Sequence, residues 1–324
     1  MDNIANVIGA LRLGEGRAFQ ALTMIPVFAE SPGPAPAYAT LDDALARGEV
    51  EITEISEGGR VPELELVNRG ERPVLLLDGE ELAGAKQNRV LNLSVLAPPG
   101  TTRLPVSCVE AGRWAWRERR FRATGRTQYA RARAEKLAQV CESRFTDQGW
   151  HADQHAVWDA IAEKQRRLGV HSATGAMSDL FEHFNTRIDD YVAAFHPEAG
   201  QTGALFQLDG RTEGLELFDH PDTLARNLPK IVRGYALDAI DPSRLNDAAP
   251  RRFPGPRDFL DRLAQADTHA FPSPGLGRDL RLEGEGLRGA ALVWEGRVIH
   301  LVAFAMGTPR PRHRPHGRNR ATNS

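Results

Sequence analysis

Short runs of apolar residues, many of them alternating with polar residues, recur along the N-terminal part of the chain and are bounded by Gly or Pro. Alternation with a period of two is typical of β-strands, whose successive side chains point to opposite faces of a sheet. The N-terminal region is therefore predicted to be mainly antiparallel β-structure. The predicted strands cover residues 18–28, 50–56, 64–67, 74–77, 90–96 and 104–110, and a short helix covers 40–47.

After residue 124 the apolar residues recur three and four positions apart, which is the spacing of amphipathic helices. A strand hairpin, with Asp209-Gly210 as its turn, is expected within this region. The expected helices cover residues 128–145, 153–168, 175–195, 221–239 and 256–266, and the expected strands cover 204–208, 215–218, 278–282, 290–294 and 297–305.

This pattern predicts the α+β class, with a mainly antiparallel N-terminal β region followed by a helical region and a C-terminal hairpin, helix and strand segment. The predicted domains are a mainly β region over residues 1–124 and a helix-rich α+β region over 125–306. Residues 307–324 are rich in Arg and Pro and are predicted to be a disordered tail.

The formal net charge of −2 averages over three unlike regions. Residues 307–324 carry five Arg and no acidic residue, and residues 113–136 carry nine basic residues against two acidic ones. The remainder, with 27 basic and 41 acidic residues, has a net charge of −14. An acidic body repels a phosphate backbone except at the basic segments, so the balance favours a small anionic ligand over nucleic acid.

Composition excludes several classes of protein. The 41% hydrophobic and 26% charged residues are ordinary for a globular chain, and two cysteines are too few for a secreted disulfide framework. The chain opens without the pattern of a secretory signal, and no run of 18 apolar residues predicts a membrane span. A reducing cytoplasm without membrane attachment is the expected setting.

Two apparent motifs are better explained by structure than by chemistry. Gly284, Gly286 and Gly289 fit the dinucleotide-binding spacing, but the segment after them is predicted to be a strand rather than a helix, which favours a hairpin turn. His151 and His155 have the spacing of zinc ligands on a helix, yet the glutamate that would act as general base is missing between them.

Cys108 leaves two alternatives open. It alternates with Leu104 and Val106 in a predicted strand, as a buried core cysteine does. Its polar neighbours also allow a thiolate nucleophile, provided that a nearby charge lowers its pKa.

Residues 78–92, DGEELAGAKQNRVLN, are unusually rich in polar groups although apolar strands are predicted on both sides. Such a segment is either exposed to solvent or the wall of a polar pocket, because buried polar groups need hydrogen-bond partners. The segment combines three carboxylates, two cations and several amides, namely Asp78, Glu80, Glu81, Lys86, Arg89, Gln87, Asn88 and Asn92.

The strand and turn over residues 107–114 add further polar groups and an aromatic ring, and we expect them to lie beside this segment. Arg and Lys next to amides suit a phosphate or carboxylate group. Trp114 or Trp116 could stack on a base. The predicted ligand-binding residues are Lys86, Gln87, Asn88, Arg89, Asn92, Ser107, Cys108, Arg113 and Trp114, and Glu80, Glu81 and Glu110 are the candidate general bases or Mg²⁺ ligands.

Two neighbouring features have competing interpretations. Residues 113–136 interleave Trp, Phe and Tyr with Arg, which suits nucleic-acid binding but also fits a solvated charged face. Ser172 or Thr174 most simply caps the helix that follows, although a helix N-terminus also attracts anions.

Several segments resemble a bacterial family, the ADP-ribosylglycohydrolase- and rhodanese-phosphatase-superfamily-associated protein domain family. The likeness runs from about residue 6 to residue 238 and does not include the stretch after Pro250. It rests on GEELAGAKQNRVLN and VSCVEAGRW, with ITEISEGGRVPELELVNRG before them and DQHAVWDAI and SATGAM after them. The family has no assigned activity, so the resemblance implies a setting in ADP-ribose or NAD-linked metabolism and no catalytic residue.

The sequence thus predicts binding, and as an option hydrolysis, of a phosphorylated, nucleotide-derived small molecule. Lys86 and Arg89 would contact the anion, Asn88 and Asn92 would orient it, and Arg113 with Trp114 would close the site. The alternative is an interaction module for nucleic acid or protein that uses residues 113–136 and the Arg-rich tail.

Overall fold

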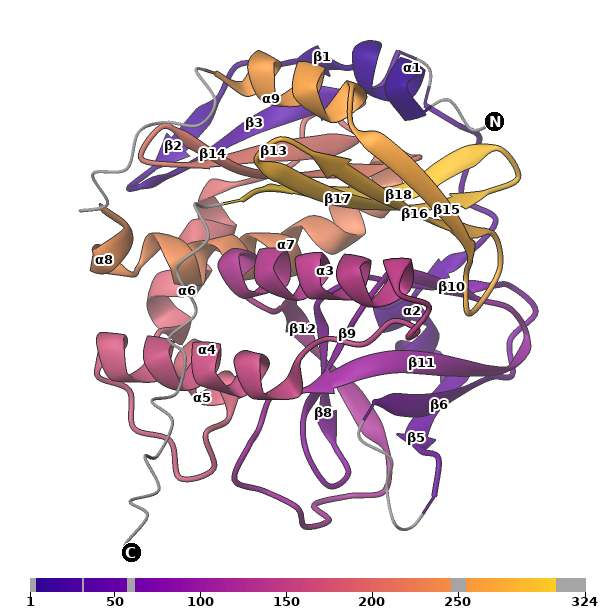
Figure 1. Cartoon of the computed structure of the whole chain (residues 1–324), viewed down its shortest axis with the longest axis vertical. Helices are drawn as coiled ribbons and strands as arrows, with labels where there is room; N and C mark the ends of the chain where they lie inside the picture. Colours follow the sequence, from indigo (N-terminus) through magenta and orange to yellow (C-terminus); the bar gives the residue numbers. More distant parts are fainter. Residues whose placement is uncertain (1–3, 31, 57–61, 246–254, 307–324) are drawn as a thin grey trace, which may run out of the picture.

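The computed structural model describes residues 4–30, 32–56, 62–245 and 255–306. Figure 1 shows a large sheet with helices on both of its faces, and the strands of two smaller sheets below it in this view. The predicted α+β class is confirmed. The predicted tail, residues 307–324, lies outside the described residues.

The large sheet has nine antiparallel strands in the order β1-β3-β13-β14-β18-β17-β16-β15, with β2 beside β3. Strand β3 pairs along its length with β13, so the start of the chain joins a sheet otherwise built by its C-terminal half. The predicted boundary at residue 124 therefore does not separate one sheet from another. The strands are β1 (Arg12–Leu13), β2 (Arg17–Phe19), β3 (Leu22–Phe28), β13 (Gly203–Leu208), β14 (Arg211–Phe218), β15 (Asp267–Pro272), β16 (Arg278–Gly284), β17 (Leu287–Trp294) and β18 (Arg297–Ala305).

Apolar residues on both faces of the large sheet explain why strands β3, β13 and β18 are mostly apolar along their length. Leu205 packs in the core on one side, and the adjacent Phe206 packs in the core on the other. Helices α1 (Ile4–Gly9) and α9 (Pro256–Ala264) cover one face, and α3 (Ala130–Phe145) and α7 (Pro221–Ala239) cover the other (Figure 1). The helices farther from the sheet are α4 (Gln154–Leu168), α5 (Met177–His183), α6 (Asn185–Ala194) and α8 (Pro242–Leu245).

None of the helices in the described part of the chain is both long and apolar enough to cross a membrane.

The two smaller sheets share one apolar core with helix α2 (Leu41–Ala46). One sheet has the strand order β12-β8-β9-β11-β6-β5 and the other β10-β7-β4, in which β4 and β7 are parallel. Their strands are β4 (Ala39–Thr40), β5 (Val50–Glu54), β6 (Glu63–Asn68), β7 (Val74–Leu76), β8 (Glu80–Gly84), β9 (Arg89–Leu91), β10 (Val95–Ala97), β11 (Gly100–Cys108) and β12 (Phe121–Thr127).

Two turn predictions are confirmed. Asp209 and Gly210 have φ angles of 48° and 71° and join β13 to β14, as a tight hairpin with two left-handed residues requires. Gly284 and Gly286 lie at the turn between β16 and β17. The glycine triplet is therefore part of a hairpin and opens no helix.

Other predicted elements are interrupted. The strand predicted over 90–96 is two strands, β9 and β10, because residues 92–94 leave the ladder and use Asn92 and Ser94 for side-chain hydrogen bonds. The helix predicted over 175–195 breaks at Phe184 into α5 and α6. Strand β12 was not predicted, because FRATGRT has little apolar alternation.

A buried network of charges joins α3 to both the large sheet and the smaller ones. Arg133 donates from Nε to Asp78 Oδ2 at 3.2 Å and from Nη1 to Glu216 Oε1 at 2.6 Å. Lys136 Nζ lies 2.6 Å from Asp78 Oδ1, and His300 Nε2 lies 2.9 Å from Glu216 Oε2. Burial alone would raise the pKa of Asp78, but Lys136 and Arg133 outweigh burial and hold it below its ordinary value. Asp78 is thus part of the framework between the sheets.

Candidate functional site

The polar segment 78–92 forms the β8–β9 hairpin and its flanks, and every residue in it is buried. Arg89 has no exposed surface, and Lys86 is only 8% exposed. A solvated polar surface is therefore the wrong interpretation of this segment. Its polar groups are satisfied by one another, by strand β11 and by the segment between β11 and β12, residues 109–120, which we call the tryptophan loop.

Glu110 opens the tryptophan loop and collects hydrogen bonds from three directions. Its Oε2 lies 2.7 Å from Arg113 Nη2 and accepts from the backbone N–H of Asn88 at 3.1 Å. Its Oε1 accepts from Thr174 Oγ1 at 2.9 Å. Burial alone would raise the pKa of Glu110, but these hydrogen bonds outweigh burial and keep the pKa below its ordinary value. Glu110 is therefore a charged anchor with both oxygens engaged.

Arg113 fixes the path of the loop. Its Nη1 donates to the carbonyl oxygens of Ala85 and Ala115 at 2.7 and 2.9 Å. Its Nη2 donates to Asn88 Oδ1 at 3.2 Å and to the carbonyl oxygen of Gly84 at 3.3 Å. These acceptors occupy both terminal nitrogens of the guanidinium, so Arg113 holds the loop onto the β8–β9 turn.

Arg89 lies behind this anchor and is enclosed by polar partners. Its Nη1 donates to Gln87 Oε1 at 3.1 Å and its Nη2 to Glu54 Oε1 at 3.3 Å. Gln87 in turn donates to the carbonyl oxygen of Glu110 and accepts from Cys108 Sγ at 3.0 Å. Burial raises the pKa of Glu54 more than Arg89 and Lys86 lower it. Arg89 and Glu54 therefore form an ion pair below the surface.

The cluster reaches the surface at Lys86 and two tryptophans. The Lys86 ammonium lies 5.1 Å from the ring centre of Trp114 and 5.2 Å from that of Trp116. These are cation–π distances, and the Arg89 guanidinium lies 5.9 Å from the Trp114 ring. The two tryptophans are 49% and 47% exposed. Two large rings are thus presented to solvent beside the Lys86 ammonium.

The other predicted binding residues support this arrangement from behind. Ser107 donates to Asn92 Oδ1 at 2.8 Å, and Asn92 donates to the carbonyl oxygen of Trp150 at 2.9 Å. Gln154, at the start of α4, exchanges two 2.8 Å hydrogen bonds with the backbone of Cys108. Burial raises the pKa of the Cys108 thiol, which supports the core interpretation of this cysteine over the thiolate nucleophile.

Two of the three candidate catalytic carboxylates have other partners. Glu80 Oε1 lies 2.5 Å from Lys230 Nζ on α7, and Glu80 Oε2 accepts from the N–H of Leu77. Glu81 Oε2 accepts from Arg126 Nε at 2.5 Å. Glu110 belongs to the tryptophan loop instead. Glu80, Glu81 and Glu110 were predicted to share one catalytic role. Each of them is instead paired with a different cation.

No group of three or more His, Cys, Asp or Glu side chains is placed to hold a metal ion within the described ranges. Binding of Mg²⁺ by Glu80, Glu81 or Glu110 stays a prediction. His151 and His155 are exposed, and Asp153 between them caps helix α4 by accepting from the N–H groups of His155 and Ala156.

Three members of the cluster were missed from the sequence as site residues. Glu54 reaches Arg89 across 35 residues of sequence, and Gln154 reaches Cys108 across 46. Thr174 was expected as a possible helix cap and instead donates to Glu110, whereas Ser172 accepts from Ala176 just before α5. Contacts between residues so far apart along the chain cannot be recognised from the local sequence pattern.

Acid should weaken the fold partly through Glu110. Because its folded-state pKa lies below the unfolded value of about 4.3, its contribution is fully present above that value and is lost as pH falls through the folded-state pKa. We expect the unfolding free energy of Glu110→Gln to fall less steeply between pH 5 and pH 2 than that of the wild type, because unfolding of the variant takes up about one proton fewer. Urea unfolding at a series of pH values measures this slope. An unchanged pH slope in that variant would contradict the ion pair with Arg113.

Comparison with known proteins identifies the family of this chain. The model of the ARG and Rhodanese-Phosphatase-superfamily-associated Protein domain, in which ARG stands for ADP-ribosylglycohydrolase, matches residues 10–304. The match extends beyond the limit at residue 238 that the sequence segments indicate, and it includes the strands after Pro250. Neither a curated protein nor a solved structure matches the chain. The chain therefore belongs to this domain family.

Proposed function

We propose that this member of the ARG and Rhodanese-Phosphatase-superfamily-associated Protein domain family binds a nucleotide-derived anion of the ADP-ribose type at the tryptophan loop. The observation that carries the proposal is the pair of half-exposed rings, Trp114 and Trp116, held beside the Lys86 ammonium. Base–aromatic stacking contributes about 1–3 kcal/mol per base, and a lysine serves phosphate as a point charge.

The surroundings of the two rings favour an anion. The side chain of Arg117 is 63% exposed, and Arg119, two positions later, is also exposed. Beneath them the Arg89 guanidinium, which is paired with Glu54, lies close to the Trp114 ring. A base stacked on Trp114 or Trp116 would place an attached phosphate within reach of these cations.

Binding is favoured over hydrolysis. A general base needs a carboxylate oxygen that can reach the water or hydroxyl to be deprotonated. Glu110, the carboxylate of the tryptophan loop, has both oxygens engaged by Arg113, Asn88 and Thr174. Hydrolysis with Glu80, Glu81 or Glu110 as base, assisted by Mg²⁺, is the weaker form of the proposal.

The family and the cysteines support the setting. The family name associates the domain with ADP-ribosylglycohydrolases and rhodanese-phosphatases, and this association supports an ADP-ribose-related setting. Both cysteines, Cys108 and Cys141, are free and buried, as suits a reducing cytoplasm.

A thermal-shift screen tests the proposal. We expect ADP-ribose, NAD or a simple nucleotide at millimolar concentration to raise the melting temperature, because ligand at 100 times its Kd contributes about 2.7 kcal/mol. Trp114→Ala should reduce the shift. Phe145→Ala, which removes another exposed aromatic ring far along α3, should leave it unchanged. Absence of any shift, or an equal shift in both variants, would exclude the nucleotide site.

A second candidate function is binding of single-stranded nucleic acid by the same rings. It is favoured by the exposed side chains of Arg117 and Arg119 in the same loop and of Arg122 on β12. The predicted basic surface over 113–136 is not continuous, however, because Arg113, Arg133 and Lys136 are buried. Nucleic-acid binding would fall steeply with salt, whereas binding of a single nucleotide would change little.

A further inference from the structure

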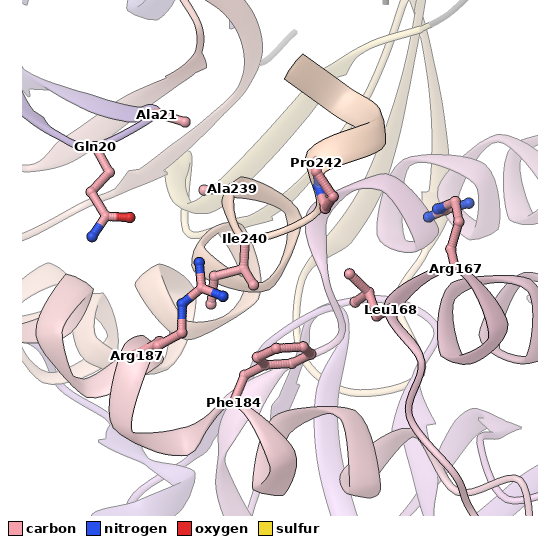
Figure 2. A pocket seen from close by; sticks show the side chains of 9 residues that line it. All are labelled: Gln20, Ala21, Arg167, Leu168, Phe184, Arg187, Ala239, Ile240 and Pro242. Atoms are coloured by element: carbon pink, nitrogen blue, oxygen red, sulfur yellow. The ribbon is translucent and has the colours of Figure 1, made fainter. Parts of the chain in front are cut away.

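A cavity of about 480 Å³ lies on the opposite end of α4 from the tryptophan loop. It is formed where the C-terminal ends of α4 and α7 meet the start of α6 and the turn between β2 and β3 (Figure 2). Its volume is within the range of small-molecule sites, roughly 300–1,000 Å³. None of its lining residues belongs to the tryptophan loop or to the cluster around Glu110.

Most of the lining is apolar. Leu168 from α4, Phe184 between α5 and α6, and Ile240 at the end of α7 supply the larger side chains, and Ala21 and Ala239 leave space between them. Such a surface accepts the aromatic or aliphatic body of a ligand, because contact with it removes apolar area from water.

Two arginines at the cavity differ in what they contact. Arg167 is bound to Asp241, with nitrogen–oxygen distances of 3.1 and 2.6 Å, so its charge is compensated. Arg187 on α6 is exposed, and its guanidinium lies 5.7 Å from the Phe184 ring. In Figure 2 this guanidinium points toward Ile240. Among the described residues Arg187 forms no ion pair with a carboxylate, and Asp189 on the same helix pairs with Arg233 instead.

We propose that this cavity is a second binding site, for a small organic anion with an aromatic or aliphatic body. Leu168, Phe184 and Ile240 would enclose the body, and Arg187 would pair with the anionic group at the mouth. The combination of an apolar wall with one uncompensated guanidinium selects an amphipathic carboxylate, sulfonate or phosphate over a neutral molecule. This site is independent of the nucleotide site proposed above. A ligand can occupy the cavity whether or not a nucleotide binds at the tryptophan loop.

Fluorescence titration of the full chain with 8-anilinonaphthalene-1-sulfonate tests the proposal, with uncharged N-phenyl-1-naphthylamine as the matched probe. We expect saturable binding of the sulfonate that Arg187→Glu weakens about tenfold or more, while the uncharged probe changes less than about twofold. Leu168→Trp, which fills the cavity, should weaken both probes. Arg166→Glu, the same charge change at an exposed neighbouring position outside the cavity, should alter neither.

Each other outcome overturns the proposal. If the sulfonate does not bind, or binds Arg187→Glu and Leu168→Trp as strongly as the wild type, no ligand occupies the cavity. Equal weakening of both probes by Arg187→Glu removes the preference for an anion. Displacement of the sulfonate by ADP-ribose would make the cavity the nucleotide site instead of a second one. If nucleotides do not raise the melting temperature, by contrast, the results expected for the two probes at the cavity are unchanged.

Discussion

Replacing Arg133 with Met is expected to lower the free energy of unfolding by about 3–5 kcal/mol. Arg133 is 1% exposed and bridges Asp78, next to β8 of a smaller sheet, and Glu216 of the large sheet. Met keeps much of the side-chain volume but leaves both carboxylates short of a buried counter-charge. Asp78 would keep one cation, Lys136, and Glu216 would keep its hydrogen bond with His300.

Urea unfolding of Arg133→Met measures this effect, and Arg131→Met provides the control. Arg131 lies on the same helix and pairs through its side chain with Glu135, which is largely exposed, so its loss should cost no more than about 0.5 kcal/mol. Equal stability of the two variants would mean that the buried network does not hold α3 between the sheets.

Replacing Arg113 with Met is expected to destabilise the protein by about 3 kcal/mol and to weaken nucleotide binding at least tenfold. Arg113 is 7% exposed and holds the tryptophan loop through carbonyl oxygens and the Glu110 carboxylate. Its loss leaves Glu110 buried without its nearest cation, and the loop that carries Trp114 and Trp116 loses its attachment to the β8–β9 turn.

Urea unfolding and limited proteolysis within the loop measure the change in stability and in loop order. Arg117→Met is the matched control, because Arg117 belongs to the same loop but is mostly exposed and lies 3.9 Å from Glu110. We expect it to keep full stability and an uncleaved loop. Cleavage that is equal in both variants would show that Arg113 has no particular role in fixing the loop.

Much of the fold is predictable from the sequence, because the spacing of apolar residues and the residues that favour turns are local features of the chain. The helix over α7 and the hairpin at Asp209-Gly210 appear as expected. The sheet topology is not local: β3 pairs with β13, about 180 residues later, and no periodicity encodes that pairing. Phe184 interrupts a predicted helix although its apolar spacing continues through the break, since spacing marks the buried face and not the path of the backbone.

The polar segment 78–92 is identifiable from the sequence as exceptional, but its division among partners is not. Strand alternation places neighbouring side chains on opposite faces, so Glu80 reaches α7 while Glu81 reaches Arg126 on β12. The cation that pairs with the carboxylate on each face comes from a segment far along the chain. The aromatic and basic composition of the tryptophan loop could be recognised, whereas the anchoring of that loop by Thr174 and Asn88 required the structure.

Calorimetric titration of the full chain with ADP-ribose, in the wild type and in the double variant Trp114→Ala, Trp116→Ala, tests the central claim most directly. Stacking on one of these rings is expected to supply about 1–3 kcal/mol, so the wild type should bind and the double variant should bind at least about tenfold more weakly. The substitutions lie on exposed side chains, so the fold should be unchanged in the variant. Equal binding by the two proteins, or none by the wild type, would contradict the claim that the tryptophan loop is a nucleotide site.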